Sequence, residues 1–210
     1  MCTRFYVALS PELRPYIEAA QKNRIAEQMM RHLARPMTMT GEIRPADMAA
    51  VIAPNKRGER SVFPMRWGFY EENLHKPIVN CRIESARIKQ LWSESWKQRR
   101  CVIPASYYFE WKHYTNPNGS IRTGDKYAIQ PCGSKVTYLA DLYRIEKMRD
   151  FKYPVFVVLT RAPTDELRQI HGRMPLILPK SVVDEWISPD DEPDKGVEKA
   201  YQLNRTIFIL

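Results

Sequence analysis

Apolar and aromatic residues gather in short runs along the chain, and these runs alternate irregularly with amphipathic stretches. Runs with the length and composition of strands cover residues 4–9, 49–53, 61–70, 76–83, 100–114, 126–131, 136–145, 153–160, 173–179 and 206–210. Helical spacing or helix-start signals mark residues 10–33, 84–100, 162–172 and 181–187. Because strands and helices follow no regular alternation, the pattern favours an α+β fold with a curled, largely antiparallel sheet flanked by helices.

Local signals refine these elements. Ser10 followed by Pro11 predicts a helix start, because a hydroxyl caps the first turn and proline is tolerated there. We expect this helix to break near Asn23. Pro64 lacks a backbone N–H, so its strand should be edge-like or bulged. In residues 84–100, apolar side chains at three- and four-residue spacing predict one buried helical face made by Ile88, Leu91, Trp92 and Trp96.

Length and charge narrow the class of protein. A chain of 210 residues fits one domain, which we expect to span residues 1–210, and a hydrophobic content of 44% argues against disorder. The 33 Lys and Arg residues exceed the 24 Asp and Glu residues by nine. That surplus favours a polyanionic partner, although an ordinary basic enzyme explains it equally well. The acidic residues concentrate in residues 188–198, which we interpret as a loop.

The cysteines indicate the compartment. They are widely spaced, with no CxxC pair or zinc-like spacing, and are Cys2, Cys81, Cys101 and Cys132. The chain shows no signal peptide and no apolar run long enough to span a membrane. We therefore expect reduced thiols, a cytoplasmic protein, no metal and no contact with a membrane.

Four polar residues stand out from apolar surroundings: Cys2, Asn80, Glu110 and His171. If Met1 is removed, Cys2 presents an α-amine and a thiol on neighbouring carbons. Asn80 is equally explained as a buried amide that satisfies backbone groups, and His171 as a histidine at a helix end.

Glu110 allows two interpretations. In an alternating strand, Tyr108 and Glu110 share one face and Tyr107, Phe109 and Trp111 share the other. The ordinary interpretation places Glu110 on the solvent side. The functional one makes it a proton-transfer group whose pKa is raised by its aromatic neighbours.

Five sequence blocks together carry a resemblance to a known family. They are "MCTRF" at residue 1, "GEIRPAD" at 41, "VNCRIESAR" at 79, "RCVIPASYYFEW" at 100 and "IHGRMPLIL" at 170. In this order they resemble the SRAP family, the SOS-response-associated peptidase-like proteins that sense abasic sites in DNA. The resemblance implies the α+β SRAP fold with a barrel-like sheet, no cofactor, and a part in the DNA damage response.

The resemblance also implies a covalent reaction. After loss of Met1, the α-amine of Cys2 condenses with the ring-opened abasic aldehyde to a Schiff base, and the thiolate closes a thiazolidine that shields the lesion. An α-amine titrates near ~8 and a thiol near ~8.5, so both are partly reactive at neutral pH. Because the second attack is intramolecular, it gains on the order of 7 kcal/mol in ideal cases.

Roles for other residues follow from the same resemblance. Asn80 orients the amine or the sugar, Glu110 shuttles protons, and His171 protonates the sugar ring oxygen or serves in reversal. Candidate DNA contacts are Arg82 for the phosphate beside the lesion, Arg4 and Arg173 for the backbone, and the aromatic residues Trp67 and Phe69. Phe69 or Tyr70 stands in for the paired tryptophans that some family members insert beside the lesion. Core positions are the more ordinary interpretation of Trp67, Trp92, Trp96 and Trp186.

The implied partner is single-stranded DNA that contains abasic sites, with replication-fork proteins as further candidates. We expect a monomer in the bacterial cytoplasm, associated with the nucleoid when bound to DNA. Three positions depart from the family pattern, with Thr3, Cys81 and Gly172 where Gly, Ala and Asp are usual.

Two alternatives remain open. One is a peptidase or amidohydrolase with an N-terminal cysteine nucleophile, including an autoproteolytic one, in which the α-amine is the base and Asn80 an oxyanion donor. The other is a non-catalytic nucleic-acid-binding module, which leaves the cysteine at the second position unexplained.

Overall fold

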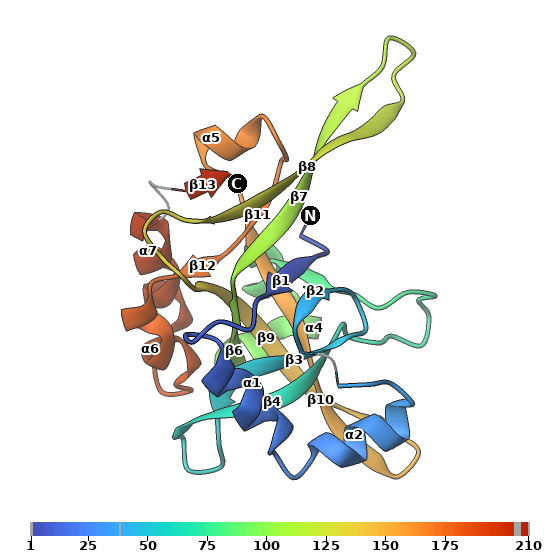
Figure 1. Ribbon diagram of the computed structural model, residues 1–210, viewed down its shortest axis with the longest axis vertical. Coiled ribbons are helices and arrows are strands. Elements are labelled where there is room, and N and C mark those ends of the chain that lie inside the picture. The colour runs from blue at the N-terminus through green and yellow to red at the C-terminus, as the bar shows by residue number, and fades with distance from the viewer. Residues whose placement is uncertain (1, 38, 204–206, 210) are drawn as a thin grey trace.

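A closed β-barrel and a second, open sheet form the framework (Figure 1). The computed structural model describes residues 2–37, 39–203 and 207–209. Within that part of the chain, the barrel strands are β3 (Met48–Pro54), β4 (Arg60–Trp67), β6 (Arg100–Ala105), β9 (Thr137–Met148) and β10 (Phe151–Arg161). The open sheet contains β1 (Phe5–Val7), β2 (Gly41–Ile43), β7 (Tyr107–Thr115), β8 (Ile121–Pro131) and β13 (Ile207–Ile209). Short strands attached to the barrel are β5 (Asn80–Arg82), β11 (Met174–Pro175) and β12 (Ile177–Leu178).

The barrel closes because each of its strands pairs on both sides. The pairings run from β10 to β4, β3, β6 and β9 and return to β10. All are antiparallel except β4 with β10. The strand β10 is almost entirely buried, as its continuous apolar sequence predicts. These pairings confirm the predicted α+β class with a curled, largely antiparallel sheet.

Helices lie around this framework (Figure 1). They are α1 (Arg14–Gln21), α2 (Ala26–Leu33), α3 (Ile83–Ala86), α4 (Gln90–Gln98), α5 (Asp165–Arg168), the 3-10 helix η1 (Lys180–Val182), α6 (Val183–Ile187) and α7 (Pro193–Leu203). None of the described helices is long and apolar enough to cross a membrane.

Ser106 is the corner at which the chain leaves the barrel for the open sheet. Its backbone N–H donates to the carbonyl of Tyr6 at 2.8 Å, and its hydroxyl accepts from the N–H of Ala8 at 2.9 Å. The predicted single run over residues 100–114 is therefore two strands in different sheets. The sheets meet where Phe5 of β1 lies against Trp67 of β4, with ring centroids 5.1 Å apart.

Some predicted boundaries are wrong. The first helix begins at Arg14 rather than at Ser10, but Ser10 caps the turn before it as predicted, because its hydroxyl accepts from the Leu13 N–H at 3.3 Å and its carbonyl accepts from the Arg14 N–H at 2.9 Å. Its break near Asn23 is confirmed, since α1 ends at Gln21 and α2 begins at Ala26.

The predicted helix over residues 84–100 is two helices, and this break changes its buried face. Trp92 and Trp96 are buried as predicted, whereas Ile88 is 82% exposed and Leu91 is 39% exposed. Lys89 has an extended backbone before α4 begins at Gln90, so the residues on either side no longer share one helical face.

The predicted acidic loop over residues 188–198 is wrong in its second half, where α7 begins at Pro193. Val197 and Ala200 bury one face of this helix, and Gly196 lies directly against the ring of Trp186. Proline at the first helical position suits this start, because its missing N–H is not needed there.

Candidate active site

The four polar residues from distant parts of the sequence lie together where the open sheet meets the barrel. Cys2 precedes β1, Asn80 begins β5, Glu110 lies in β7 and His171 lies between α5 and β11. The amide Nδ2 of Asn80 donates to the carbonyl oxygen of Cys2 at 2.8 Å. The His171 Nδ1 atom is 3.8 Å from Oε1 of Glu110, and the Glu110 charge acts on the Cys2 thiol.

Strand pairing explains this assembly. β1 pairs with β7 through Phe5 and Tyr108, and the N–H of Phe109 donates to the carbonyl of Arg4 at 2.9 Å. The chain before Phe5 therefore continues alongside Glu110. On the barrel side, β5 pairs with β10, where Asn80 is opposite Val158. The site thus joins one strand of each sheet, and residues 78 positions apart become hydrogen-bond partners.

Glu110 is buried, which resolves its two interpretations. Tyr108 and Glu110 do share one face of β7, but that face points inward, with exposed fractions of 0% and 3%. The solvent-side interpretation is therefore wrong. Burial raises the pKa of the Glu110 carboxyl, because the apolar surroundings disfavour its charged form. A carboxyl in this environment suits proton transfer near neutral pH.

Cys2 is fully buried in a chain that still carries Met1, so its nitrogen belongs to a peptide bond. Its Sγ donates to the carbonyl of Arg4 at 3.5 Å. Burial, and then the nearby Glu110 charge, raise the pKa of the Cys2 thiol well above its usual range. In this form the sulfur is a protonated thiol, and reaction requires a group that accepts its proton.

His171 is neutral at physiological pH, because burial lowers the pKa of its imidazole. The backbone N–H of Arg173 donates to Nδ1 at 3.0 Å. The carbonyl of Arg173 lies 3.2 Å from the same Nδ1, so Nδ1 accepts from the N–H in one neutral tautomer and donates to the carbonyl in the other.

His113 is a site residue that the sequence reasoning missed. Its ring centroid lies 5.3 Å from that of His171, at an interplanar angle of 80°. Strict alternation along β7 groups His113 with Phe109 and Trp111, away from Glu110. However, the register between β7 and β8 shifts between Trp111 and His113, and such irregularities re-aim side chains. A single sequence carries no signal for this shift.

The arginines predicted to contact DNA differ in whether a carboxylate already binds them. Arg82 is exposed, two residues after Asn80, and forms no ion pair among the described residues. Arg4 contacts Glu42 at 2.6 Å, and Arg173 makes a two-pronged contact with Glu84, both distances being 2.9 Å.

These carboxylates also escaped the sequence reasoning. Glu42 additionally accepts from Lys126 at 2.6 Å, and this bond and the one from Arg4 lower the pKa of Glu42 to about 2. Arg173 likewise lowers the pKa of Glu84. A phosphate that binds Arg4 or Arg173 must therefore compete with an existing carboxylate.

The aromatic candidates Trp67 and Phe69 do not face solvent. Both are 0% exposed, so the predicted DNA contacts of these two residues are wrong. Trp67 donates through Nε1 to the carbonyl of Val79 at 2.9 Å, and Phe69 packs against Trp92. The core interpretation of the tryptophans is confirmed, since each of Trp67, Trp92, Trp96 and Trp186 is buried. Tyr70 is 38% exposed, with the guanidinium of Arg66 4.5 Å from its ring centroid.

No cluster of three or more His, Cys, Asp or Glu side chains among the described residues could hold a metal ion. The four cysteines are free thiols, as predicted, and Cys132 is the exposed one.

Comparison with known proteins links this site to a family. The family model described as SOS response associated peptidase (SRAP) matches residues 1–206. The abasic site processing protein YoaM of Bacillus subtilis is 29% identical over 139 residues, which is 62% of this chain and 58% of its own length. The abasic site processing protein YedK of Escherichia coli is 26% identical over 192 residues, which covers 89% of this chain and 79% of its own.

Solved structures share the fold. A protein from Bacteroides thetaiotaomicron aligns with a TM-score of 0.72 at 16% identity, covering 99% of this chain and 90% of its own. A phage-related protein from Bordetella bronchiseptica aligns with a TM-score of 0.68 at 19% identity, covering 100% and 93%. At these identities the likeness concerns the fold.

Proposed function

Because the chain belongs to the SRAP family, we propose that it processes abasic sites in single-stranded DNA by forming a covalent crosslink through Cys2. The observation that carries the proposal is the hydrogen bond from Asn80 to the carbonyl of Cys2, beside the Glu110–His171 pair. This bond holds the second residue of the chain, at a terminus that otherwise frays, among groups suited to proton transfer.

The proposed reaction begins after Met1 is removed, which frees the nitrogen of Cys2 and opens this end to the sugar. The α-amine adds to the aldehyde carbon of the ring-opened abasic sugar, and water leaves as the imine forms. The thiol sulfur then bonds to the imine carbon, and its proton ends on the ring nitrogen. The product is a thiazolidine that joins Cys2 to the DNA.

The neighbouring side chains supply the protons. Glu110, whose pKa is raised by burial, donates a proton to the departing water and accepts the proton of the thiol. His171, which lies beside Glu110, donates a ring proton toward the sugar ring oxygen during opening. Asn80 keeps Cys2 oriented so that the second attack is intramolecular.

Arg82 is proposed to bind the phosphate beside the lesion, because it is exposed and lies on the strand that carries Asn80. Arg4 and Arg173 are held in place by their ion pairs with Glu42 and Glu84, beside the proposed DNA-binding surface. The peptidase alternative needs the Asn80 amide to donate to an oxyanion, whereas its Nδ2 here donates one N–H to the Cys2 carbonyl.

A crosslinking assay tests the proposal. The protein, checked by intact mass for loss of Met1, is incubated with a single-stranded oligonucleotide that carries one abasic site and is then run on a denaturing gel. We expect a heat-stable, slowly migrating band that is absent with the undamaged oligonucleotide and with Cys2→Ala. Cys2→Ser keeps the amine, so it should give a band only after borohydride reduction.

Absence of a wild-type band at confirmed loss of Met1 refutes the crosslink. If the same preparation instead cleaves peptide amides and Cys2→Ala abolishes the cleavage, the peptidase alternative is correct.

A further inference from the structure

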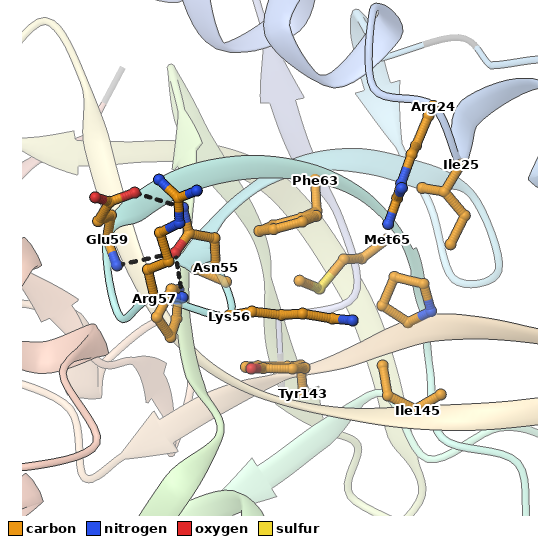
Figure 2. Close-up of a pocket in the computed structure, with 13 residues that line it drawn as sticks. Arg24, Ile25, Asn55, Lys56, Arg57, Glu59, Phe63, Met65, Tyr143 and Ile145 are labelled. Atoms are coloured by element: carbon orange, nitrogen blue, oxygen red, sulfur yellow. Dashed lines mark hydrogen bonds between the residues drawn. The ribbon is translucent and has the colours of Figure 1, made fainter.

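A cavity of about 470 Å³ opens on the barrel wall where β4 and β10 separate (Figure 2). The two strands pair at Arg66 with Val155 and at Trp67 with Phe156. Before these residues, β4 pairs only with β3, and β10 pairs only with β9. Prolines border the opening on both strands, Pro64 on β4 and Pro154 on β10, and they offer no N–H that could extend the ladder. As a whole β4 pairs on both sides, so the edge-like strand predicted from Pro64 is confirmed only for residues 60–65, which pair with β3 alone.

Apolar side chains line the inside of this pocket. In Figure 2, Phe63 and Met65 lie on one side of it, and Tyr143 and Ile145 lie on the other. Ile145 is 48% exposed, so part of this apolar lining is accessible from solvent. The volume and the lining are typical of ligand-binding pockets. The residues that line it include none of the four active-site residues.

Cations surround this apolar lining. Arg57 lies toward one end of the pocket in Figure 2, Arg24 toward the other, and the Lys56 side chain extends between Phe63 and Tyr143. Arg24, Lys56 and Arg57 are exposed and form no ion pair within the described part of the chain. The pocket's acidic residue, Glu59, accepts from Nδ2 of Asn55 at 3.0 Å.

We propose that this pocket binds an acidic peptide segment of a partner protein and seats one aromatic or aliphatic side chain on its apolar lining. Charge complementarity carries the choice of occupant. The cations are spread along the opening, which matches carboxylates on both sides of a central apolar anchor better than one anionic head group. A buried apolar anchor inside a polar rim is the usual arrangement of a protein interface.

Nucleic acid is the competing polyanion, and the lining argues against it. A base has polar edges that need hydrogen-bond partners when they are buried. The apolar side chains of Met65, Ile25 and Pro154 offer such an edge no hydrogen-bond partner. The Asn55 amide is already engaged, since its Oδ1 accepts from the backbone N–H of Arg57 and its Nδ2 donates to Glu59. The pocket therefore favours an apolar side chain over a base.

Fluorescence polarisation with a labelled probe tests this docking site. The probe is a nine-residue peptide with a central phenylalanine flanked on each side by four Asp or Glu residues. Control probes replace the phenylalanine with serine or the acidic residues with lysine. We expect saturable binding of the first probe, and at least tenfold weaker binding of each control.

Protein variants locate the binding. Lys56→Glu/Arg57→Glu reverses the charge of the rim, and Ile145→Asp places a charge at the apolar lining. Both changes affect exposed side chains, and each should weaken binding at least tenfold. Lys89→Glu/Lys97→Glu is the matched control with the same change in net charge at exposed positions of another surface, and it should bind within twofold of wild type.

The proposal is overturned if the acidic probe does not bind, or if the rim and lining variants bind it as wild type does. Displacement of the probe by an oligothymidylate, lost in the same variants, would assign the pocket to nucleic acid instead. Crosslinking to abasic DNA by these variants should stay at the wild-type rate, so the outcome is independent of the proposed reaction at Cys2.

Discussion

The hydrogen bond from Asn80 to the Cys2 carbonyl ties the start of the chain to the barrel, and we expect Asn80→Ala to slow crosslinking. A made hydrogen bond contributes about 1 kcal/mol, and a buried acceptor left without a partner costs about 1–3 kcal/mol. Asn80 is only half-buried, so water can satisfy part of the loss, and the lower half of this range applies. A penalty of about 1–2 kcal/mol corresponds to a rate roughly 5–30 times slower.

Single-turnover crosslinking on a denaturing gel, with excess protein over abasic DNA, measures this rate. Urea unfolding of the same variant separates a loss of orientation from a loss of overall stability. Asn55→Ala is the matched control, because it removes a side-chain amide whose bond to Glu59 lies at the barrel-wall pocket, away from Cys2. If Asn80→Ala crosslinks at the wild-type rate while remaining folded, the carbonyl contact does not position the nucleophile and the reasoning fails.

Three further predictions concern buried groups. Burial raises the folded-state pKa of Glu110 above its unfolded value, so ionisation of this carboxyl destabilises the fold as pH rises through the folded pKa. In urea unfolding, Glu110→Gln should therefore be more stable relative to wild type at pH 8 than at pH 5. The rate of imine formation by this variant should also no longer depend on the ionisation of the carboxyl. Asp141 is 0% exposed, and burial likewise raises its pKa, so its ionisation also destabilises the fold as pH rises. Asp141→Asn should therefore stabilise the protein more at pH 8 than at pH 5, and an equal effect at both pH values would contradict this. Gly196→Ala should destabilise the protein by about 1–3 kcal/mol in thermal unfolding, because a new Cβ would lie 2.8 Å from the ring of Trp186. In the control Gly58→Ala, a new Cβ would meet open space, so any loss of stability should come only from the backbone strain of its positive φ.

The sequence alone predicted the local elements and the residue set of the site. Its apolar runs located most strands, and Asn23 marked the true break between α1 and α2. The motif resemblance identified Cys2, Asn80, Glu110 and His171, which the structure brings together. These features are local or inherited from the motif, so they are readable without knowing how the sheets pack.

Tertiary packing decided which face of each element is covered. Alternation along β7 correctly paired Tyr108 with Glu110, but only contact between the open sheet and the barrel makes that face the buried one. Phe69 was predicted to contact DNA, but it packs in the core against Trp92, and this contact between residues distant in the sequence is not readable from local pattern.

Charge pairing and irregular register also depend on the whole fold. Arg4 and Glu42 meet because β1 pairs with β2, and His113 approaches His171 because the β7–β8 ladder shifts its register. The cavity on the barrel wall exists because β4 and β10, each with a proline before their shared pairing, diverge there. Side-chain periodicity along one strand determines which residues share a face, but contacts between residues far apart in sequence determine what that face meets.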